Sequence, residues 1–197
     1  MKGLINLPEL QHLQRVSQHE FRVALIALVG VLLFGVLKGV LLAAIASLVL
    51  LIRLAAHPTT VLLGRIRGTD QFSNVERHPE NQLIPGILIY RINSGIVYFN
   101  VDNIQQDFFK RLFQQEVPVQ LVIFDLSSSP LIDTPAARWF QTFYQQLTTQ
   151  GIALRIVNAN GIVRDRLRAE RLETITGFLD RSASIESVVT EFTVDNS

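Results

Sequence analysis

The chain contains no cysteine, and this absence excludes several kinds of site at once. Without a thiol there is no disulfide, no thiolate nucleophile and no cysteine-ligated zinc. The histidines, His12, His19, His57 and His78, are scattered through terminal and connecting segments, so they do not form a cluster of metal ligands. We therefore expect neither a metal site nor a cofactor.

An excess of charge of one sign is also lacking, because 18 Lys and Arg residues face 17 Asp and Glu residues, for a formal net charge of +1. A nucleic-acid-binding domain would carry a clustered basic face, so no nucleic-acid partner is expected. The sequence has no H-E-x-x-H, no G-x-S-x-G and no P-loop motif, which accompany metalloprotease, hydrolase and NTPase chemistry. We do not expect an enzyme, and a nucleotide ligand is not favoured.

A long apolar run is what the sequence does have. Residues 21–56 are almost entirely apolar, with Lys38 near the middle. A single helix through this run would be ~54 Å long, whereas the hydrocarbon core of a bilayer is ~30 Å thick. It would also place Lys38 deep in lipid, at a cost of at least ~2.5 kcal/mol. We therefore predict a transmembrane helical hairpin with spans near 21–37 and 39–56 and a turn at Lys38 and Gly39.

The residues that flank the run indicate its orientation in a membrane. Basic residues lie before and after it, at Lys2, Arg15, Arg22, Arg53, Arg65 and Arg67. By the positive-inside rule both ends face the cytoplasm, so we expect a multi-pass protein of the cell (inner) membrane. Residues 1–20 carry apolar side chains at near-helical spacing, which predicts an interfacial helix. They do not resemble a signal peptide, because the apolar run begins too late and lacks a cleavage pattern.

The second half of the chain has the pattern of an α/β domain. Residues 57–84 are polar and interrupted by proline and glycine, and we interpret them as a connector. The following residues, 85–193, alternate β-rich runs with amphipathic stretches. Strands are predicted at 86–92, 95–99, 119–126 and 152–157, and helices at 101–112, 135–150, 161–170 and 184–192. This alternation predicts helices packed on a sheet.

One stretch, LVIFDLSSSPLIDTPAARWF, carries the most information about function. A buried strand runs into Asp125, a serine-rich loop containing Ser127 follows, and Asp133 and Thr134 come next. Thr134 suits the N-cap of a helix, Pro135 suits its first position, and Asp133 is favoured there by the helix dipole. Loop and cap chemistry is therefore sufficient to explain all of these residues.

This strand–loop–helix pattern resembles the STAS domain, which sulfate transporters share with anti-sigma-factor antagonists. The likeness extends to FGVLKGVLLAAIASLVLLIRLAAHP, LGRIRGTDQFSNVERHPE and PGILIYRINSGIVYFN, which resemble the C-terminal third of SulP-family (SLC26-like) anion transporters. The resemblance implies the last two membrane segments of such a transporter, followed by a STAS domain with a mixed sheet and about four helices.

The resemblance also implies a regulatory or assembly role in the transport of an anion, above all sulfate. The family builds its substrate site from broken helices in membrane segments that are not in this sequence, so we do not expect the chain to transport alone. The alternative is a membrane-tethered STAS module that docks partner proteins independently of transport. The expected partners are the membrane, the remaining transporter segments or a second copy of the chain, and a cytoplasmic protein that binds the STAS domain.

Two positions depart from the family pattern. The phosphorylatable serine of the antagonists is replaced by Pro135, so their phosphorylation switch is not expected at that position. Arg171 stands where the family usually has a glycine that fits a helix C-cap, which implies a small loss of stability. The candidate regulatory or phosphate-binding loop comprises Asp125, Ser127, Asp133 and Thr134.

Overall fold

A computed structural model of the chain describes residues 18–173 and 183–195. The chain divides into two compact units, Met1–Ala55 and Ala56–Ser197. The interfacial helix predicted for residues 1–20 lies almost wholly outside the described residues, since only residues 18–20 are described and these begin the helix α2.

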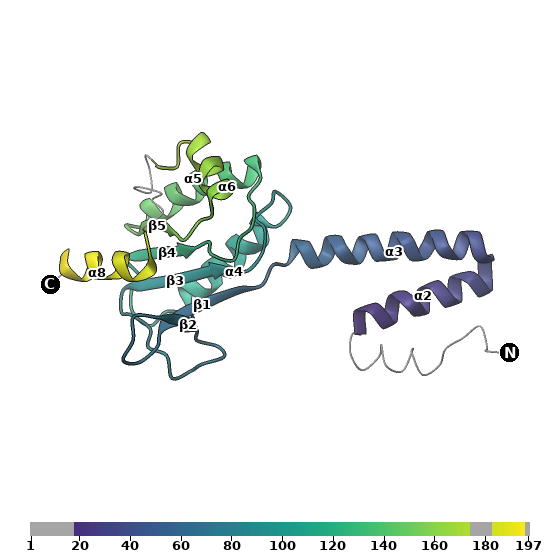
Figure 1. Ribbon diagram of the computed structural model, residues 1–197, viewed down its shortest axis with the longest axis horizontal. Helices are drawn as coiled ribbons and strands as arrows, with labels where there is room; N and C mark the ends of the chain where they lie inside the picture. The colour runs from purple at the N-terminus through teal and green to yellow at the C-terminus, as the bar shows by residue number, and fades with distance from the viewer. Residues whose placement is uncertain (1–17, 174–182, 196–197) are drawn as a thin grey trace. The chain divides into compact units, whose positions relative to one another are not determined.

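The first unit contains two helices that form a hairpin, α2 (Gln18–Phe34) and α3 (Val36–Ala56) (Figure 1). Between them Gly35 has a φ of 83°, a left-handed conformation that glycine adopts without steric penalty. The hairpin was therefore predicted correctly as a pair of helices, but the predicted position of the turn, at Lys38 and Gly39, was wrong. Lys38 lies in the first turn of α3 and is exposed.

Gly39 has a different role, because it lies where the two helices come into close contact. A Cβ added to Gly39 would lie 2.4 Å from the backbone nitrogen of Val31, and a Cβ added to Gly30 would lie 3.3 Å from the Cα of Gly39. Small residues allow membrane helices to approach at such distances. Among the described residues, α3 is the helix that is both long and apolar enough to cross a membrane.

The second unit is built on a five-stranded mixed sheet with the strand order β2-β1-β3-β4-β5. Its strands are β1 (Thr60–Arg65), β2 (Phe72–Asn74), β3 (Ile87–Ile92), β4 (Leu121–Asp125) and β5 (Ala153–Val157). Strand β1 is antiparallel to both β2 and β3, whereas β3, β4 and β5 are parallel to one another. Helix α4 (Val101–Phe113) connects β3 to β4, and α5 (Thr134–Thr148) connects β4 to β5.

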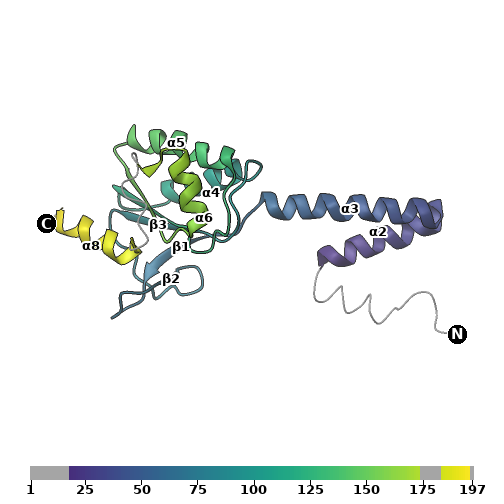
Figure 2. The same cartoon turned by 45° about the horizontal axis from the view of Figure 1, so that its top comes forward.

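Helices cover both faces of the sheet, because alternate residues of the buried strands point to opposite sides. On one face the strands pack against α4, α5 and α6 (Gly161–Ala169) (Figure 2). The core on this face contains an aromatic cluster that includes Tyr90, Phe108 and Phe124. On the other face, Ile89 and Ile123 belong to a smaller apolar cluster that is completed by α8 (Ile185–Asp195). This confirms the predicted α/β class and its four packed helices.

Two predictions of local structure were wrong. Strands β1 and β2 lie within the segment that was interpreted as a connector. Its glycines were taken as interruptions, but Gly64 lies inside β1, where a Cβ would lie 2.9 Å from Cγ2 of Val75. The strand predicted at 95–99 is a loop, because the buried side chain of Asn100 accepts from the amide of Val97 and donates to the carbonyl of Gly95.

The end of α6 explains the departure at Arg171. This residue has a φ of 59°, in the left-handed region that favours glycine. The amide of Arg171 donates to the carbonyl of Arg168, and the amide of Leu172 donates to the carbonyl of Leu167. This is the pair of hydrogen bonds of a Schellman motif. The left-handed conformation strains Arg171, and this strain is the physical reason for the small loss of stability expected from the sequence.

Candidate functional site

The candidate site is the loop between β4 and α5, at the carboxyl ends of the parallel strands. Asp125, the last residue of β4, is fully buried and forms an ion pair of 2.6 Å with Nε of Arg91 on β3. Its other oxygen, Oδ1, accepts from the backbone amide of Ser127 at 3.0 Å and from the side-chain amide of Asn158 at 3.1 Å. The carboxylate thus fastens the ends of β3, β4 and β5 together.

The N-cap of α5 is Asp133, so the prediction that Thr134 is the cap was wrong by one residue. Asp133 has an extended backbone, and its Oδ1 accepts from the amide of Ala136 at 2.8 Å. Its Oδ2 accepts from the amide of Tyr98 at 2.9 Å. A carboxylate both caps the helix and interacts favourably with its dipole, and it leaves the hydroxyl of Thr134 available for another partner.

That partner is an arginine of α6. Nη1 of Arg166 donates to Oγ1 of Thr134 at 3.0 Å, and this is a hydrogen bond between a charged donor and a neutral acceptor. The neighbouring α6 arginine, Arg164, donates to the carbonyl of Ala159, which is also neutral. The edge formed by the start of α5 and by α6 therefore carries positive charge beside a hydroxyl.

The serines of the loop differ in their exposure. Ser127 is exposed. Ser129 is fully buried, and its hydroxyl donates to the carbonyl of Ile92 at 3.0 Å. The side-chain amide of Asn160, the N-cap of α6, donates to the carbonyls of Ser129 and Pro130. The loop is therefore held from both sides, with Ser127 left at its surface.

These contacts limit what the loop can do chemically. Both carboxylates are occupied by several hydrogen-bond donors, and within the described residues no group of three or more His, Asp or Glu side chains is arranged to hold a metal ion. The hydroxyl of Thr134 lies beside the guanidinium of Arg166. A phosphate ester at this hydroxyl would give Arg166 an anionic acceptor, and a hydrogen bond between two charged groups is stronger than the present one to a neutral hydroxyl.

Sequence reasoning missed a second polar cluster, centred on Asp107 of α4. Its Oδ2 accepts from Oγ1 of Thr60 at 2.6 Å, from the hydroxyl of Tyr90 at 2.8 Å and from Nε of Arg111 at 2.7 Å. Nη1 of Arg111 also donates to the carboxylate of Glu76 at 2.6 Å. The cluster joins the start of β1 to β3 and α4.

The environment of this cluster shifts the pKa values of Asp107 and Tyr90. Burial opposes ionisation of Asp107, but the hydrogen bonds from Thr60, Tyr90 and Arg111 outweigh it and lower the pKa of Asp107. Burial, reinforced by the hydrogen bond to Asp107, raises the pKa of the Tyr90 hydroxyl, although the contact with Thr60 opposes this. The i, i+4 spacing of Asp107 and Arg111 was a signal in the sequence, but Thr60 lay in the segment assigned to the connector.

The chain that enters this domain is also hydrogen-bonded to α4. The side-chain amide of Asn103 donates to the carbonyl of Ala56 at 2.7 Å. The amide of Asn93, just after β3, donates to the carbonyl of Thr59 at 2.9 Å. Together with the bond from Thr60 to Asp107, these contacts fix the first residues of the domain against β3 and α4.

Comparison with known proteins identifies the domain. A family model described as the STAS domain matches residues 78–185, more than half of the chain. Two plant proteins are among the similar curated relatives. The chloroplastic sulfate transporter 4.1 of Arabidopsis thaliana is 32% identical over 81% of this chain. The high affinity sulfate transporter 1 of Stylosanthes hamata is 28% identical over 89% of this chain.

A bacterial relative, a probable sulfate transporter of Mycobacterium tuberculosis, is 27% identical over 86% of this chain. The chain covers 27%, 25% and 30% of the lengths of the Stylosanthes, Arabidopsis and Mycobacterium proteins. It therefore corresponds to less than a third of each of these relatives.

Solved structures agree on the fold. The overall structure of SLC26A9 superimposes with a TM-score of 0.79 and 16% identity, over 96% of this chain and 32% of that one. A structure of the murine Slc26a9 anion transporter in the inward-facing state gives a TM-score of 0.73 and 17% identity, over 81% and 26%. The chain belongs to the STAS-domain family, and its similarity to proteins named sulfate transporters extends over most of its length.

Proposed function

We propose that the chain is the regulatory and assembly portion of a SulP-type anion transporter whose substrate is sulfate, and that it does not transport by itself. One observation carries this proposal. The similarity to proteins named sulfate transporters extends over 81% to 89% of the chain in two plant relatives, so it includes helical residues as well as the domain. A free-standing soluble STAS domain would have no counterpart to the apolar helices.

The size of the membrane part supports the proposal that the chain does not transport by itself. Transporters of this kind bind their substrate near the bilayer midplane, between broken helices from paired repeats. The hairpin α2–α3 consists of two helices joined at Gly35, which do not enclose such a site. We expect the chain to act together with other transporter segments or with a second copy, and to have no enzymatic activity.

The proposed location is the cell (inner) membrane, with α2 and α3 in the bilayer and the STAS domain in the cytoplasm. Exposed apolar side chains along α3 support this arrangement, because they have no partner within the described residues that would shield them from water. Because Lys38 lies close to the turn, its ammonium group can reach the headgroup layer on the side of the membrane opposite the cytoplasm. This topology places both ends of residues 21–56 on the cytoplasmic side.

Membrane fractionation and site-specific labelling test this topology. The protein should resist carbonate extraction, and Lys38→Cys should react with an impermeant thiol reagent applied from outside the cell. A cysteine at Asp70, an exposed residue of the domain, is the matched control and should react only after the membrane is permeabilised. The native chain has no cysteine, so no background labelling is expected. Labelling of Lys38→Cys from the cytoplasmic side alone would reject the two-span arrangement.

A second candidate function is a membrane-tethered STAS module that docks a cytoplasmic partner protein independently of transport. The contact between Arg166 and the hydroxyl of Thr134 favours it, because a charged donor beside a hydroxyl suits a phosphate-dependent switch. In this proposal the loop of Asp125, Ser127, Asp133 and Thr134 is regulatory. The carboxylates hold its shape, and the hydroxyls of Ser127 and Thr134 are the groups to be modified.

A pull-down with Thr134→Ala and Thr134→Asp separates the two candidates. Because Asp133 is the cap, both variants should melt close to the unmodified protein. If the loop is a switch, they should retain different sets of cytoplasmic proteins. Identical retention at equal melting temperature would leave the transporter role and reject the switch at this residue.

A further inference from the structure

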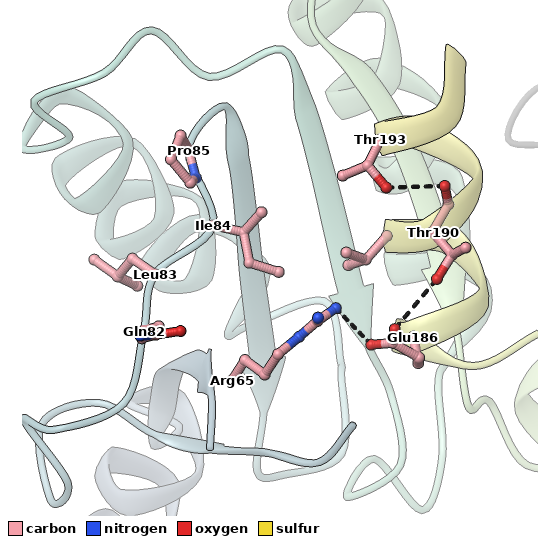
Figure 3. A pocket seen from close by; sticks show the side chains of 9 residues that line it. Arg65, Gln82, Leu83, Ile84, Pro85, Glu186, Thr190 and Thr193 are labelled. Atoms are coloured by element: carbon pink, nitrogen blue, oxygen red, sulfur yellow. Dashed lines mark hydrogen bonds and ion pairs between the residues drawn. The ribbon is translucent and has the colours of Figure 1, made fainter. Parts of the chain in front are cut away.

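A cleft separates α8 from the segment that precedes β3. The residues that line it are distant in the sequence from the β4–α5 loop. The volume of the cleft is about 260 Å³. Gln82, Leu83, Ile84 and Pro85 form one wall, and α8 forms the other with Glu186, Val189, Thr190 and Thr193 (Figure 3). The side chain of Arg65, at the end of β1, reaches across the cleft to α8. This volume lies below the range of roughly 300–1,000 Å³ typical of drug-sized ligands, so the cleft suits a small metabolite.

The polar side of the cleft is an ion pair whose hydrogen-bonding capacity is only partly used. Nη2 of Arg65 donates to Oε2 of Glu186 at 2.7 Å, and the two side chains are 31% and 30% exposed. Oε1 of Glu186 accepts from the hydroxyl of Thr190 at 3.2 Å. Within the described residues, Nε of Arg65 is buried and has no hydrogen-bond partner. A guanidinium has several N–H donors, and Glu186 engages a single nitrogen of this one.

An unpaired buried donor destabilises a protein, so an acceptor that engages Arg65 in the cleft would offset part of that cost. The acceptor must also tolerate the carboxylate of Glu186 nearby. A simple oxyanion such as sulfate would be attracted by Arg65 and repelled by Glu186, so the neutral pair gives it no net advantage. A ligand that carries one positive and one negative group side by side meets both requirements.

We propose that this cleft binds a free α-amino acid with an apolar side chain. The α-carboxylate accepts from Arg65, including the unused donors that a small rearrangement of the guanidinium brings into reach. The α-ammonium donates to Glu186 and to the hydroxyl oxygen of Thr190. The side chain lies between Ile84 and Val189, on the apolar part of the walls.

Binding at this place has a structural consequence. The ligand would bridge the segment 82–85 and α8, and α8 completes the apolar cluster on its face of the sheet. The matched family region ends at Ile185, the first residue of α8, so the cleft includes a helix that lies beyond that region. An amino acid in the cleft would therefore fasten this helix to the sheet. The inference does not depend on the proposed transport role.

Calorimetric titration of the full chain in detergent tests the charge requirement. L-leucine is the zwitterionic probe, leucine amide carries only the positive group, and 4-methylpentanoate carries only the negative group on the same side chain. We expect leucine to bind. Each analogue should have a dissociation constant at least about tenfold higher, because each lacks one charge-assisted interaction. Equal binding of either analogue, tighter binding of sulfate, or no binding of leucine at 10 mM would overturn the proposal.

Variants locate the site. Arg65→Lys and Glu186→Gln should weaken leucine binding by about tenfold or more. Arg138→Lys and Glu170→Gln are matched controls, because Arg138 and Glu170 form an ion pair of 3.0 Å that does not line the cleft, and they should leave binding unchanged. Binding unaffected by the first two substitutions would place the ligand elsewhere and reject the site.

Hydrogen exchange of the unmodified chain gives an independent measurement that needs no variant. Leucine should slow amide exchange in residues 82–86 and 185–195, the two walls of the cleft, and leave residues 101–113 of α4 unchanged. Protection that spares both walls would contradict the proposal even if every variant failed to fold.

Discussion

Replacing Asp107 by asparagine removes the charge at the centre of the polar cluster and retains the shape of the side chain. Three donors converge on Oδ2 of Asp107 at 2.6–2.8 Å, from Thr60, Tyr90 and Arg111. The Tyr90 side chain is fully buried, so its hydroxyl has little access to water after the change. Charge-assisted hydrogen bonds are about twice as strong as neutral ones.

The expected loss is moderated by solvent. The side chain of Asp107 is 34% exposed, and Arg111 keeps its second carboxylate, Glu76. Allowing for screening at this exposure, we expect Asp107→Asn to lower the free energy of unfolding of the domain by about 2 kcal/mol. For a domain of this size, the corresponding fall in Tm is about 5–8 °C.

Trp139 provides the assay, because it is the single tryptophan and it lies in the domain rather than in the hairpin. Its fluorescence reports unfolding of the domain in the full chain in detergent. Asp165→Asn is the matched control, since Asp165 is exposed on α6 and should change stability by less than about 0.5 kcal/mol.

The pH dependence gives the sharper test. The pKa of Asp107 is lowered in the folded protein, so its stabilising contribution is present above the ordinary pKa of aspartate, near 3.9. That contribution is lost as the pH falls through the folded pKa. The difference between native chain and Asp107→Asn should therefore be full at pH 7 and should shrink below about pH 4. A difference that is equal at pH 7 and pH 3, or no larger than that of Asp165→Asn, would refute this reasoning.

Three further substitutions have expected outcomes. Asp133→Ala should lower the free energy of unfolding by about 1–2 kcal/mol, measured by thermal melting, because the amide of Ala136 loses its cap; an unchanged Tm would argue against the cap. Arg171→Gly should raise the free energy of unfolding by about 0.5–1 kcal/mol by relieving a left-handed arginine, and a lower Tm would contradict this explanation. Gly39→Leu should separate α2 from α3 near Val31, increasing the distance between spin labels on the two helices, and an unchanged distance would contradict the close contact.

Much of the fold could be predicted because periodicity follows from burial. The continuous apolar run of β4 is buried on both faces, and Val101, Ile104, Phe108 and Leu112 form the buried face of α4. These patterns depend on local spacing, so they can be seen in a single sequence. The resemblance to the STAS domain rested on the stretch that runs from β4 through the loop into α5, and it was confirmed by the family match.

What could not be predicted depended on contacts between distant residues. Gly64 looks like a breaker, yet the close approach of Val75 explains why a glycine lies inside β1. The turn was predicted at Gly39 and lies at Gly35, because either glycine can end a helix, and only the approach of Val31 shows that Gly39 lies in the contact between the helices. In each case the deciding neighbour is not apparent from local sequence patterns.

In the candidate loop, too, local patterns could be predicted and contacts between distant residues could not. Its position, between a buried strand and a helix start, was clear from the sequence. The capping residue was predicted one position too late, at Thr134 instead of Asp133, because both residue types cap helices well. The partner of Thr134, Arg166, lies on another helix, and nothing in the local sequence indicates this contact.

Sulfate uptake by cells that lack their own sulfate transport tests the central claim most directly. Cells expressing this chain alone, with its membrane insertion verified, should take up labelled sulfate no faster than cells carrying the empty vector, whereas a full-length relative in the same cells should restore uptake. Uptake above the vector level that disappears when residues 21–56 are deleted would contradict the account, because it would make the hairpin itself a transport path.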